Sequence, residues 1–316
     1  MSLSDSSGPD KLRVALGPLT LPNPVLVAAG TFGYGLEFAR AVPLKRLGGV
    51  IIKTLTRRPR EGNPPPRLVE TPSGMLNAVG LQNIGLESFL AEQLPLLRAI
   101  GVPIIVSILG ETPEELADMA RRLEGADGVA AIELNLSCPN ITHRSAGLHP
   151  GMVAQDPEAT AAMVGAARGA TRKPLIAKLS PDVTDLAPIA QAAERSGADV
   201  LSLVNTFVGM SLDPATRRSR LGMLTGGLSG PAIRPLAVYR VWYTAQSVHI
   251  PVIGLGGIVR AEDALEFFLA GASAVAVGTA TFADPRAALR VLHGLERYLT
   301  RHRIGSLGEL RGAINR

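Results

Sequence analysis

Residues 104–113 read Ile-Ile-Val-Ser-Ile-Leu-Gly-Glu-Thr-Pro and contain both elements of the fold that we predict. The apolar run Ile104 to Ile108 lacks a strict alternation of apolar and polar residues, which is typical of a strand buried on both faces. Thr112-Pro113 then indicates a helix start, because threonine caps a first turn and proline fits its first position. The stretch therefore predicts a buried parallel strand followed by a helix, Pro113 to Leu123.

The same unit of strand and helix recurs along the whole chain. The predicted strands are Val25 to Ala28, Val50 to Lys53, Ile104 to Ile108, Ile132 to Asn135, Leu175 to Leu179, Val200 to Val204, Val252 to Gly254 and Ala274 to Val277. The predicted helices are Leu36 to Ala41, Leu86 to Ile100, Pro113 to Leu123, Pro157 to Ala170, Leu186 to Ser196, Arg234 to Val248, Ala261 to Ala270 and Pro285 to His302, the last opened by Asp284-Pro285. Eight alternations predict an α/β fold, a closed (β/α)8 TIM barrel, with an open doubly wound sheet as the alternative.

Three kinds of segment lie outside these units. Residues 1–10 are polar and predict a disordered N-terminal tail, so that residues 11–316 would form a single domain. Leu12 to Leu21, with Gly17-Pro18 at its centre, predicts a hairpin that caps the barrel floor. The connections Arg57 to Gly85 and Thr206 to Pro231 are long, and they would emerge at the C-terminal face, where active sites of this fold lie.

Composition narrows the class of protein. The 316 residues are 46% hydrophobic and include one cysteine, which excludes an internal disulfide and a four-thiolate cluster and suits a reducing cytoplasm. No run of 18 apolar residues appears, so we expect a soluble protein without a membrane partner. The net charge of +5 is small for a chain of 316 residues, so no nucleic acid is expected as a partner. No motif indicates a metal site.

Polar residues follow several predicted strands. They are Lys53-Thr54, Ser107, Asn135, Lys178 and Asn205-Thr206. Because the carboxyl ends of parallel strands meet at one mouth of a barrel, these groups should form a ring of hydrogen-bond donors around Cys138. A lone cysteine is either a small buried hydrophobe or a reactive thiol, and polar surroundings favour the reactive thiol.

Glycine-rich turns follow the last two predicted strands. Gly254-Leu255-Gly256-Gly257 and Gly278-Thr279 would let backbone approach a ligand closely, beside helix starts that suit a phosphate. The chain has neither a G-x-G-x-x-G fingerprint nor a Walker loop, which argues against a dinucleotide site. The turns therefore favour a mononucleotide such as FMN over NAD.

The motifs together resemble a known family. They are Ala28-Ala29-Gly30-Thr31-Phe32-Gly33, Lys53-Thr54, Asn77-Ala78-Val79-Gly80-Leu81-Gln82-Asn83, Asn135-Leu136-Ser137-Cys138-Pro139-Asn140, Asn205-Thr206, Gly226-Gly227-Leu228-Ser229-Gly230-Pro231-Ala232-Ile233, Gly256-Gly257 and Gly278-Thr279. In this order they resemble class 1 dihydroorotate dehydrogenases, flavin-dependent oxidoreductases of pyrimidine (UMP) biosynthesis. The segments at 226–233 and 53–56 look more like the NAD-linked class 1B catalytic subunit.

The resemblance implies roles for individual residues. Cys138 would take a proton from carbon 5 of dihydroorotate while hydride passes from carbon 6 to FMN, and Lys53 and Lys178 would be catalytic with it. The implied substrate-binding residues are Lys53, Asn77, Ala78, Val79, Gly80, Leu81, Asn135, Asn140, Asn205 and Thr206. The implied residues for one FMN are Ala29, Gly30, Lys53, Thr54, Ser107, Asn135, Lys178, Val204, Gly230, Gly256, Gly257, Gly278 and Thr279. Asparagines suit a flat ring of alternating donors and acceptors, because an amide supplies both polarities without charge.

Two residues differ from the pattern of the family, and the role of one loop segment stays open. Ala29 stands where relatives often have serine, and Ser107 where they often have asparagine, which weakens the implied FMN contacts there. Residues 141–152 would form a lid over Cys138 and contain His143 and His149. These histidines either tune proton release or belong to a solvated loop, and a solvated loop is the simpler interpretation.

Membership of class 1B would imply a partner. Electrons would pass to NAD through a subunit that carries FAD and a 2Fe-2S cluster, joined to a homodimer of this chain as a heterotetramer.

Three alternatives to this function stay open. They are a fumarate-linked class 1A enzyme, a tRNA dihydrouridine synthase, and a barrel kept only as a binding or scaffold subunit. The synthase would need an RNA-binding domain after the barrel, where only residues 286–316 follow.

Overall fold

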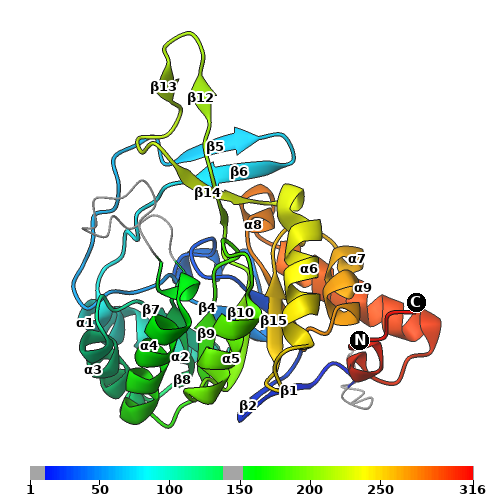
Figure 1. Ribbon diagram of the computed structural model, residues 1–316. Helices are drawn as coiled ribbons and strands as arrows, with labels where there is room; N and C mark the ends of the chain where they lie inside the picture. Colours follow the sequence, from blue (N-terminus) through cyan, green and yellow to red (C-terminus); the bar gives the residue numbers. More distant parts are fainter. Residues whose placement is uncertain (1–10, 138–151, 316) are drawn as a thin grey trace.

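Eight parallel strands form the centre of the computed structural model, which describes residues 11–137 and 152–315. They close into a barrel in the order β3, β4, β7, β8, β9, β10, β15, β16 and back to β3 (Figure 1). Their bounds are β3 (Val25–Val27), β4 (Gly49–Ile51), β7 (Ile104–Ile108), β8 (Val129–Asn135), β9 (Leu175–Lys178), β10 (Val200–Leu203), β15 (Val252–Leu255) and β16 (Ala274–Val277). The predicted (β/α)8 barrel is confirmed, and the open sheet is excluded by the closure of β16 on β3.

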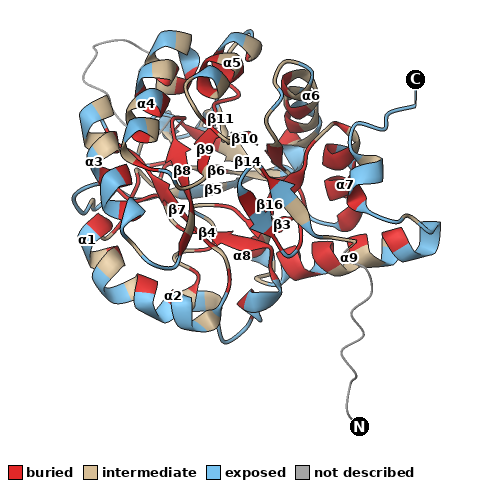
Figure 2. Ribbon diagram, turned by 90° about the horizontal axis from the view of Figure 1, so that it is seen from below, coloured by how far each residue is buried: buried red, intermediate tan, exposed pale blue. Residues whose placement is uncertain are grey.

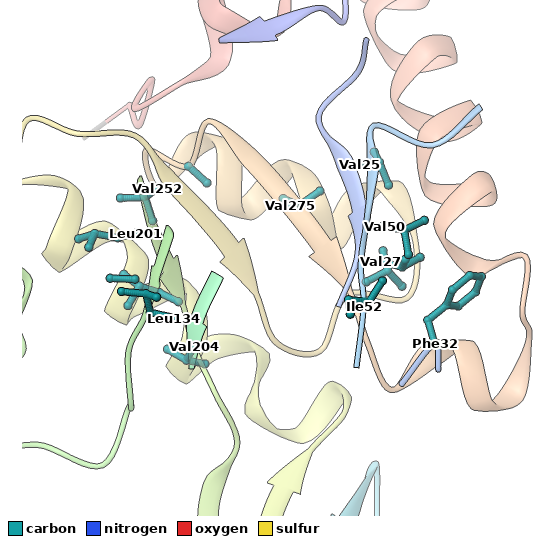
Figure 3. Close-up of a cluster of buried hydrophobic side chains, with 14 of the residues drawn as sticks. Val25, Val27, Phe32, Val50, Ile52, Leu134, Leu201, Val204, Val252 and Val275 are labelled. Carbon is teal, nitrogen blue, oxygen red and sulfur yellow. The ribbon is translucent and has the colours of Figure 1, made fainter. Parts of the chain in front are cut away.

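Each barrel strand is buried on both of its faces, which explains the unbroken apolar runs. In β3, Leu26 packs inside the barrel, whereas Val25 and Val27 pack outside it with Phe32. Figure 3 shows this outer layer, in which Val25, Val27 and Val50 lie beside Phe32. Because successive side chains of a strand point to opposite faces, burial of both faces requires apolar residues at every position.

Besides five short 3-10 segments, ten α- or π-helical segments lie within the described residues. They are α1 (Leu86–Ser88), the π-helical η3 (Phe89–Gln93), α2 (Leu94–Ile100), α3 (Pro113–Glu124), α4 (Pro157–Ala170), α5 (Ala187–Arg195), α6 (Arg234–Ala245), α7 (Ala261–Leu269), α8 (Ala280–Ala283) and α9 (Ala287–His302). Seen from below, buried residues face the barrel and exposed residues face outward (Figure 2). Thr112 caps α3 as predicted, since its Oγ1 accepts a hydrogen bond from the backbone N–H of Glu115 at 3.2 Å.

The first and last predicted helices are wrong in extent, and the helix predicted over Arg234 to Val248 ends earlier, at Ala245. The helix expected over residues 36–41 is a 3-10 turn, η1 (Leu36–Phe38), followed by a second such turn, η2 (Leu44–Arg46). Gly35 before η1 has φ +96°, and Pro43 follows, so helical backbone cannot extend far in either direction. The last helix begins at Ala287 and not at Pro285, because Asp284 ends α8 and accepts a bond from the N–H of Arg286 at 2.9 Å.

The lower end of the barrel is closed by the predicted hairpin, which consists of β1 (Val14–Leu16) and β2 (Leu19–Leu21). Leu16 and Leu21 are fully buried and belong to the same cluster as inward residues of the strands, such as Ile105 and Ile176. Figure 1 shows the hairpin beneath the strands. The hairpin therefore acts as an apolar plug that keeps water out of the barrel floor.

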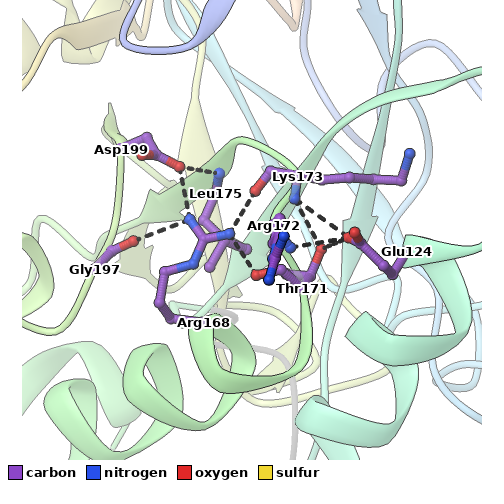
Figure 4. A network of polar contacts seen from close by, with 8 residues as sticks. All are labelled: Glu124, Arg168, Thr171, Arg172, Lys173, Leu175, Gly197 and Asp199. Atoms are coloured by element: carbon purple, nitrogen blue, oxygen red, sulfur yellow. Dashed lines mark hydrogen bonds and ion pairs between the residues drawn. The ribbon is translucent and has the colours of Figure 1, made fainter.

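Polar contacts fix the loops at this lower end (Figure 4). The Arg168 guanidinium donates to the carbonyls of Thr171, Lys173 and Gly197 and forms an ion pair with Asp199 at 2.9 Å. Asp199 also accepts a bond from the N–H of Leu175, the first residue of β9. One arginine thus positions the starts of β9 and β10.

The two long connections form a second sheet above the barrel. Its antiparallel order is β11 (Phe207–Gly209), β14 (Gly226–Ser229), β6 (Gly74–Asn77) and β5 (Leu68–Thr71). A two-stranded extension, β12 (Leu212–Asp213) and β13 (Arg218–Ser219), projects beyond it (Figure 1). The prediction of long connections at the C-terminal face is confirmed, while the sheet that joins them was not foreseen.

Candidate functional site

A pocket of about 1150 Å³ of empty space, partly open to solvent, lies between the C-terminal face of the barrel and the second sheet. Seven of the eight barrel strands, or the residues just after them, contribute polar groups or glycines to its wall; β7 does not. The predicted site residues that line it are Ala29, Gly30, Lys53, Thr54, Asn77, Val79, Gly80, Leu81, Asn135, Lys178, Val204, Asn205, Thr206, Gly230, Gly256, Gly257, Gly278 and Thr279. Residues separated by up to 250 positions in the chain therefore meet in one cavity.

A chain of amides and hydroxyls forms one wall of the pocket. Asn135 is 8% exposed and donates through Nδ2 to Thr54 Oγ1 at 3.1 Å. Asn205 donates to the carbonyl and hydroxyl oxygens of Ser137 at 2.9 and 2.8 Å, and its own Oδ1 accepts a bond from the N–H of Thr206. These bonds fix the orientation of each amide, so the wall presents set donors and acceptors to a ligand.

Two ammonium groups face the pocket. Lys178, at the end of β9, is 5% exposed, and its ammonium makes no hydrogen bond or ion pair with any described residue. Lys53 follows β4, and a Cβ built at Gly30 would lie 3.7 Å from its Nζ. Glycine at position 30, with φ +88°, therefore leaves open the space beside the Lys53 ammonium. A buried cation without a partner favours an anionic or electron-rich ligand.

The second sheet supplies the cover of the pocket. Asn77, on β6, donates through Nδ2 to the carbonyl of Gly227 on β14 at 3.1 Å. A Cβ at Gly227 would collide with the Thr206 hydroxyl, so only glycine lets β14 pack on this residue. Behind the pocket, Asn83 accepts bonds from the N–H groups of Thr56 and Gly85 and donates to the carbonyl of Leu81. The Asn83 amide thus fixes the turn that carries Leu81.

The glycine turns pack backbone against backbone. A Cβ at Gly257 would lie 2.9 Å from the Gly230 carbonyl oxygen, which brings the turns after β14 and β15 into contact. The buried Asp263 carboxylate accepts bonds from the N–H groups of Val259 and Arg260 at 2.9 and 3.0 Å and pairs with Arg234. This carboxylate therefore holds the turn after β15 against the start of α6.

Some predicted site residues do not line the pocket. Ala78 is buried in a small cluster with Leu76 and Leu221, because its side chain points away from that of its neighbour Asn77. Ser107 is fully buried inside the barrel and shares a hydrogen bond of 2.9 Å with Thr54 Oγ1. Its influence on a ligand would pass through Thr54. Cys138, Asn140, His143 and His149 lie outside the described residues.

Apolar residues complete the pocket and were missed by the sequence reasoning. They include Leu68, Met75, Ile233, Leu255, Ile258, Val259 and Phe282. Of these, Leu68 and Phe282 are 45% and 50% exposed, unusual values for large apolar side chains, and both lie at the pocket wall. No sequence signal marks them, because an apolar residue near a site looks like any core residue until its exposure is known.

Two titratable groups connect the second sheet and its loops to the barrel. Burial raises the pKa of Asp182, which accepts bonds from the N–H of Val208 on β11. Burial likewise raises the pKa of Tyr34, whose hydroxyl accepts a bond from the N–H of Ile84 at 3.1 Å.

In residues 11–137 and 152–315, no group of three or more His, Cys, Asp or Glu side chains could hold a metal ion. No helix among these residues is both long and apolar enough to span a bilayer.

The comparisons with known proteins agree on one family. The sequence profile of the family described as "Dihydroorotate dehydrogenase" matches residues 11–299. The chain is 50% identical over 303 residues to the dihydroorotate dehydrogenase B (NAD(+)), catalytic subunit, of Trichlorobacter lovleyi, covering 96% of this chain and 98% of that protein. It is 53% identical over 306 residues to the protein of the same name from Desulforudis audaxviator, covering 97% and 98%. A solved Eimeria tenella DHODH in complex with ferulenol shares the fold, with a TM-score of 0.80 and 24% identity over 99% of this chain and 90% of that one.

Proposed function

This chain belongs to the dihydroorotate dehydrogenase family, and we propose that it oxidises dihydroorotate to orotate in pyrimidine biosynthesis as the catalytic subunit of an NAD-linked enzyme. The observation that carries this proposal is identity of 50 to 53% with dihydroorotate dehydrogenase B catalytic subunits over nearly their whole length. The pocket adds independent support, because it combines a wall of amides, two ammonium groups and glycine turns at the active end of a TIM barrel.

The amide wall suits the flat ring of dihydroorotate. Asn135 and Asn205 are neighbours in one wall of the pocket, Asn77 lines it from the second sheet, and each amide offers both a donor and an acceptor. Lys53 and the backbone of residues 79–81 would hold the carboxylate and the ring edge. Asn140 would add a further amide, as the family resemblance implies.

The residues present fit FMN as the resident cofactor. Lys178 is a buried ammonium without a partner among the described residues, and Gly30 leaves open the space beside Lys53. Thr54 and Asn135 line the pocket together with these two cations, and so do Gly256, Gly257, Gly278 and Thr279, whose backbone would bind a phosphate group. When bound, FMN would accept the hydride from carbon 6 of dihydroorotate.

The chain itself would supply the proton acceptor and the charges. Cys138 would take the proton from carbon 5, since a thiol has an ordinary pKa near 8.5 and cationic neighbours increase its thiolate fraction. Lys178 would stabilise the negative charge that collects at the pyrimidine end of the flavin on reduction. The apolar residues Leu255 and Ile258 would exclude water from the reacting face.

The electron acceptor defines the subclass. The relatives are called catalytic subunits, and we propose that this chain also works with a second subunit, which carries FAD and a 2Fe-2S cluster and reduces NAD. We further propose a homodimer of this chain inside a heterotetramer, located in the cytoplasm. A fumarate-linked enzyme is the second candidate, because the proposed hydride chemistry would be the same in either class.

Anaerobic mixing of the purified, flavin-loaded chain with dihydroorotate tests the proposal. We expect the yellow flavin absorbance to bleach within the dead time or seconds of mixing, with orotate formed in equal amount. NAD alone should then fail to restore the colour, because this chain would need its partner subunit to reach NAD. Rapid recovery with fumarate would favour the fumarate-linked class.

Two outcomes would contradict the function. Flavin that stays yellow with dihydroorotate would refute the oxidation, and a chain purified without any flavin, and unable to take up FMN, would favour a scaffold subunit. RNA retained on a filter at low salt and released at high salt would instead favour the dihydrouridine synthase alternative.

A further inference from the structure

In one half of the barrel interior, the inward side chains change from apolar to polar between one inward position of each strand and the next. Ile105, Ala131, Ile176 and Val200 point inward at the level of the apolar floor. Two residues further on, and therefore on the same face, the four neighbouring strands β7 to β10 carry Ser107, Glu133, Lys178 and Ser202. These four residues form a polar layer directly beneath the pocket, and they are between 0% and 5% exposed.

Glu133 is the anomalous member of this layer. The residue is fully buried, and neither carboxyl oxygen has a hydrogen-bond partner within the described part of the chain. An isolated carboxylate in such a place is costly, because burial removes its hydration without replacing it. The fold therefore needs a reason to keep a glutamate here, where glutamine or an apolar residue would cost less.

The neighbouring strand supplies a matching charge. Glu133 pairs in register with Ile176, and Lys178 lies two residues further along β9 on the same inward face. Side chains in this diagonal relation are neighbours within reach when they are long. The Lys178 ammonium is itself largely buried and makes neither a direct ion pair nor a hydrogen bond with a described residue, Glu133 included, so the attraction between the two charges would act through space.

No other described charge competes for Glu133 from the surrounding elements. The inward residues of β3, β15 and β16 are apolar, and those of β7 and β10 at this level are serines. The remaining inward charge is Lys53, which follows β4, and β7 separates β4 from β8. Lys178 is therefore the nearest cation by topology.

We propose that Glu133 is a positioning residue for the reaction, whose carboxylate is the buried counter-charge that keeps Lys178 charged and directed into the cofactor pocket. This inference rests on the proposed function for the meaning of Lys178, but the charge pairing can be tested without substrate. Two opposite charges in a dry interior stabilise each other, whereas either one alone is destabilising. Glu133 would act on the flavin only through Lys178.

A double-mutant cycle on the full-length protein tests the pairing, with thermal unfolding as the readout. Lys178→Met should lower Tm by several degrees, because it leaves the Glu133 carboxyl buried without a cation. The double variant, Glu133→Gln with Lys178→Met, should regain most of this loss, since no buried charge remains. If Lys178→Met yields no folded protein while the double variant folds, the rescue establishes the same coupling.

The pH dependence gives a readout that a merely structural residue would not produce. In Lys178→Met, the buried Glu133 carboxylate has no counter-charge, so the variant should be less stable at pH 8 than at pH 5. In the double variant this loss should disappear. In Glu133→Gln alone, flavin reduction should slow, and more at pH 8 than at pH 5, because the Lys178 ammonium has lost its buried counter-charge.

Ser202→Ala is the matched control, because Ser202 is the neighbouring inward residue on β10, is also buried without a partner, and carries no charge. It should leave both pH profiles unchanged. Additive Tm losses in the cycle, or Glu133→Gln profiles identical to wild type, would overturn the inference. Failure of the proposed function would look different. The double variant would still regain stability, but the flavin of the wild-type protein would not be reduced by dihydroorotate.

Discussion

The lower and upper halves of the barrel interior are built on the same eight strands but have opposite chemistry. The lower half is filled by inward apolar side chains and sealed by Leu16 and Leu21 of the hairpin. The upper half carries Lys53, Asn135 and Lys178 and is covered by a sheet from two distant loops. Within one strand, therefore, only two residues separate the inward side chain that stabilises the fold from the inward side chain that faces the ligand.

The largest effect is expected from a change at the upper half. Cys138→Ala should lower turnover of dihydroorotate by about a hundredfold or more, because it removes the proposed proton acceptor. FMN content and orotate affinity should remain near those of wild type, measured by flavin absorbance and by orotate titration. Near-normal turnover in this variant would remove the thiol from the mechanism.

A change at the floor should have the reverse signature. Leu21→Ala should lower the free energy of unfolding by about 2–5 kcal/mol, since it opens a cavity at a fully buried position. Turnover well below Tm should be unchanged, because the residue lies at the opposite end of the barrel from the pocket. Chemical denaturation and steady-state rates measure the two effects.

Thr20→Ala is the matched control for the floor, because Thr20 lies on the same strand and is exposed. Its free energy of unfolding should stay within about 0.5 kcal/mol of wild type. A Leu21→Ala protein with normal stability but weakened flavin binding would break the division between the two halves.

The smallest effect is expected at Asp182, where the second sheet meets the barrel. Burial raises the pKa of this carboxyl above its usual 3.8, so its ionised form is destabilising in the folded protein, and stability falls as pH rises through the raised pKa. Asp182→Asn keeps an acceptor for the Val208 N–H and should raise Tm slightly at neutral pH, by on the order of one or two degrees. This gain should vanish below about pH 3.8, where the wild-type carboxyl is protonated in both states.

Asp182→Ala separates the charge from the hydrogen bond. This variant removes the acceptor of the Val208 N–H together with the charge, so β11 should lose part of its attachment and Tm should not rise. Equal Tm values for the Asn and Ala variants would show that the bond to Val208 contributes nothing measurable.

Much of the barrel could be predicted because its signals are local. The strand at Ile104–Ile108, the helix at Pro157–Ala170 and the strand at Ala274–Val277 have the predicted bounds, since apolar runs and capping residues lie within each element. The turn at residues 36–41 could not be distinguished from a helix, because its apolar spacing is helical while the flanking Gly35 and Pro43 decide its length.

The second sheet could not be predicted, because its strands pair across the chain. Gly227 pairs with Asn77, 150 residues away, and no local pattern in a glycine-rich segment announces that partner. The prediction that Ala78 binds the substrate was wrong because it ignored which face of the strand each residue occupies. Asn77 faces the pocket, and its neighbour in extended backbone must face the other way.

The sequence by itself determined the alternation of strands and helices, the polar residues at the strand ends and the family to which they belong. It did so because these features depend on neighbouring residues and on motif order. Only the tertiary structure decided that Leu68 and Phe282 line the pocket, that Ser107 lies behind Thr54, and that the Glu133 carboxyl is buried without a hydrogen bond to any described residue. These depend on the curvature and register of the closed barrel, which place side chains from separate strands in one interior and exclude water from it.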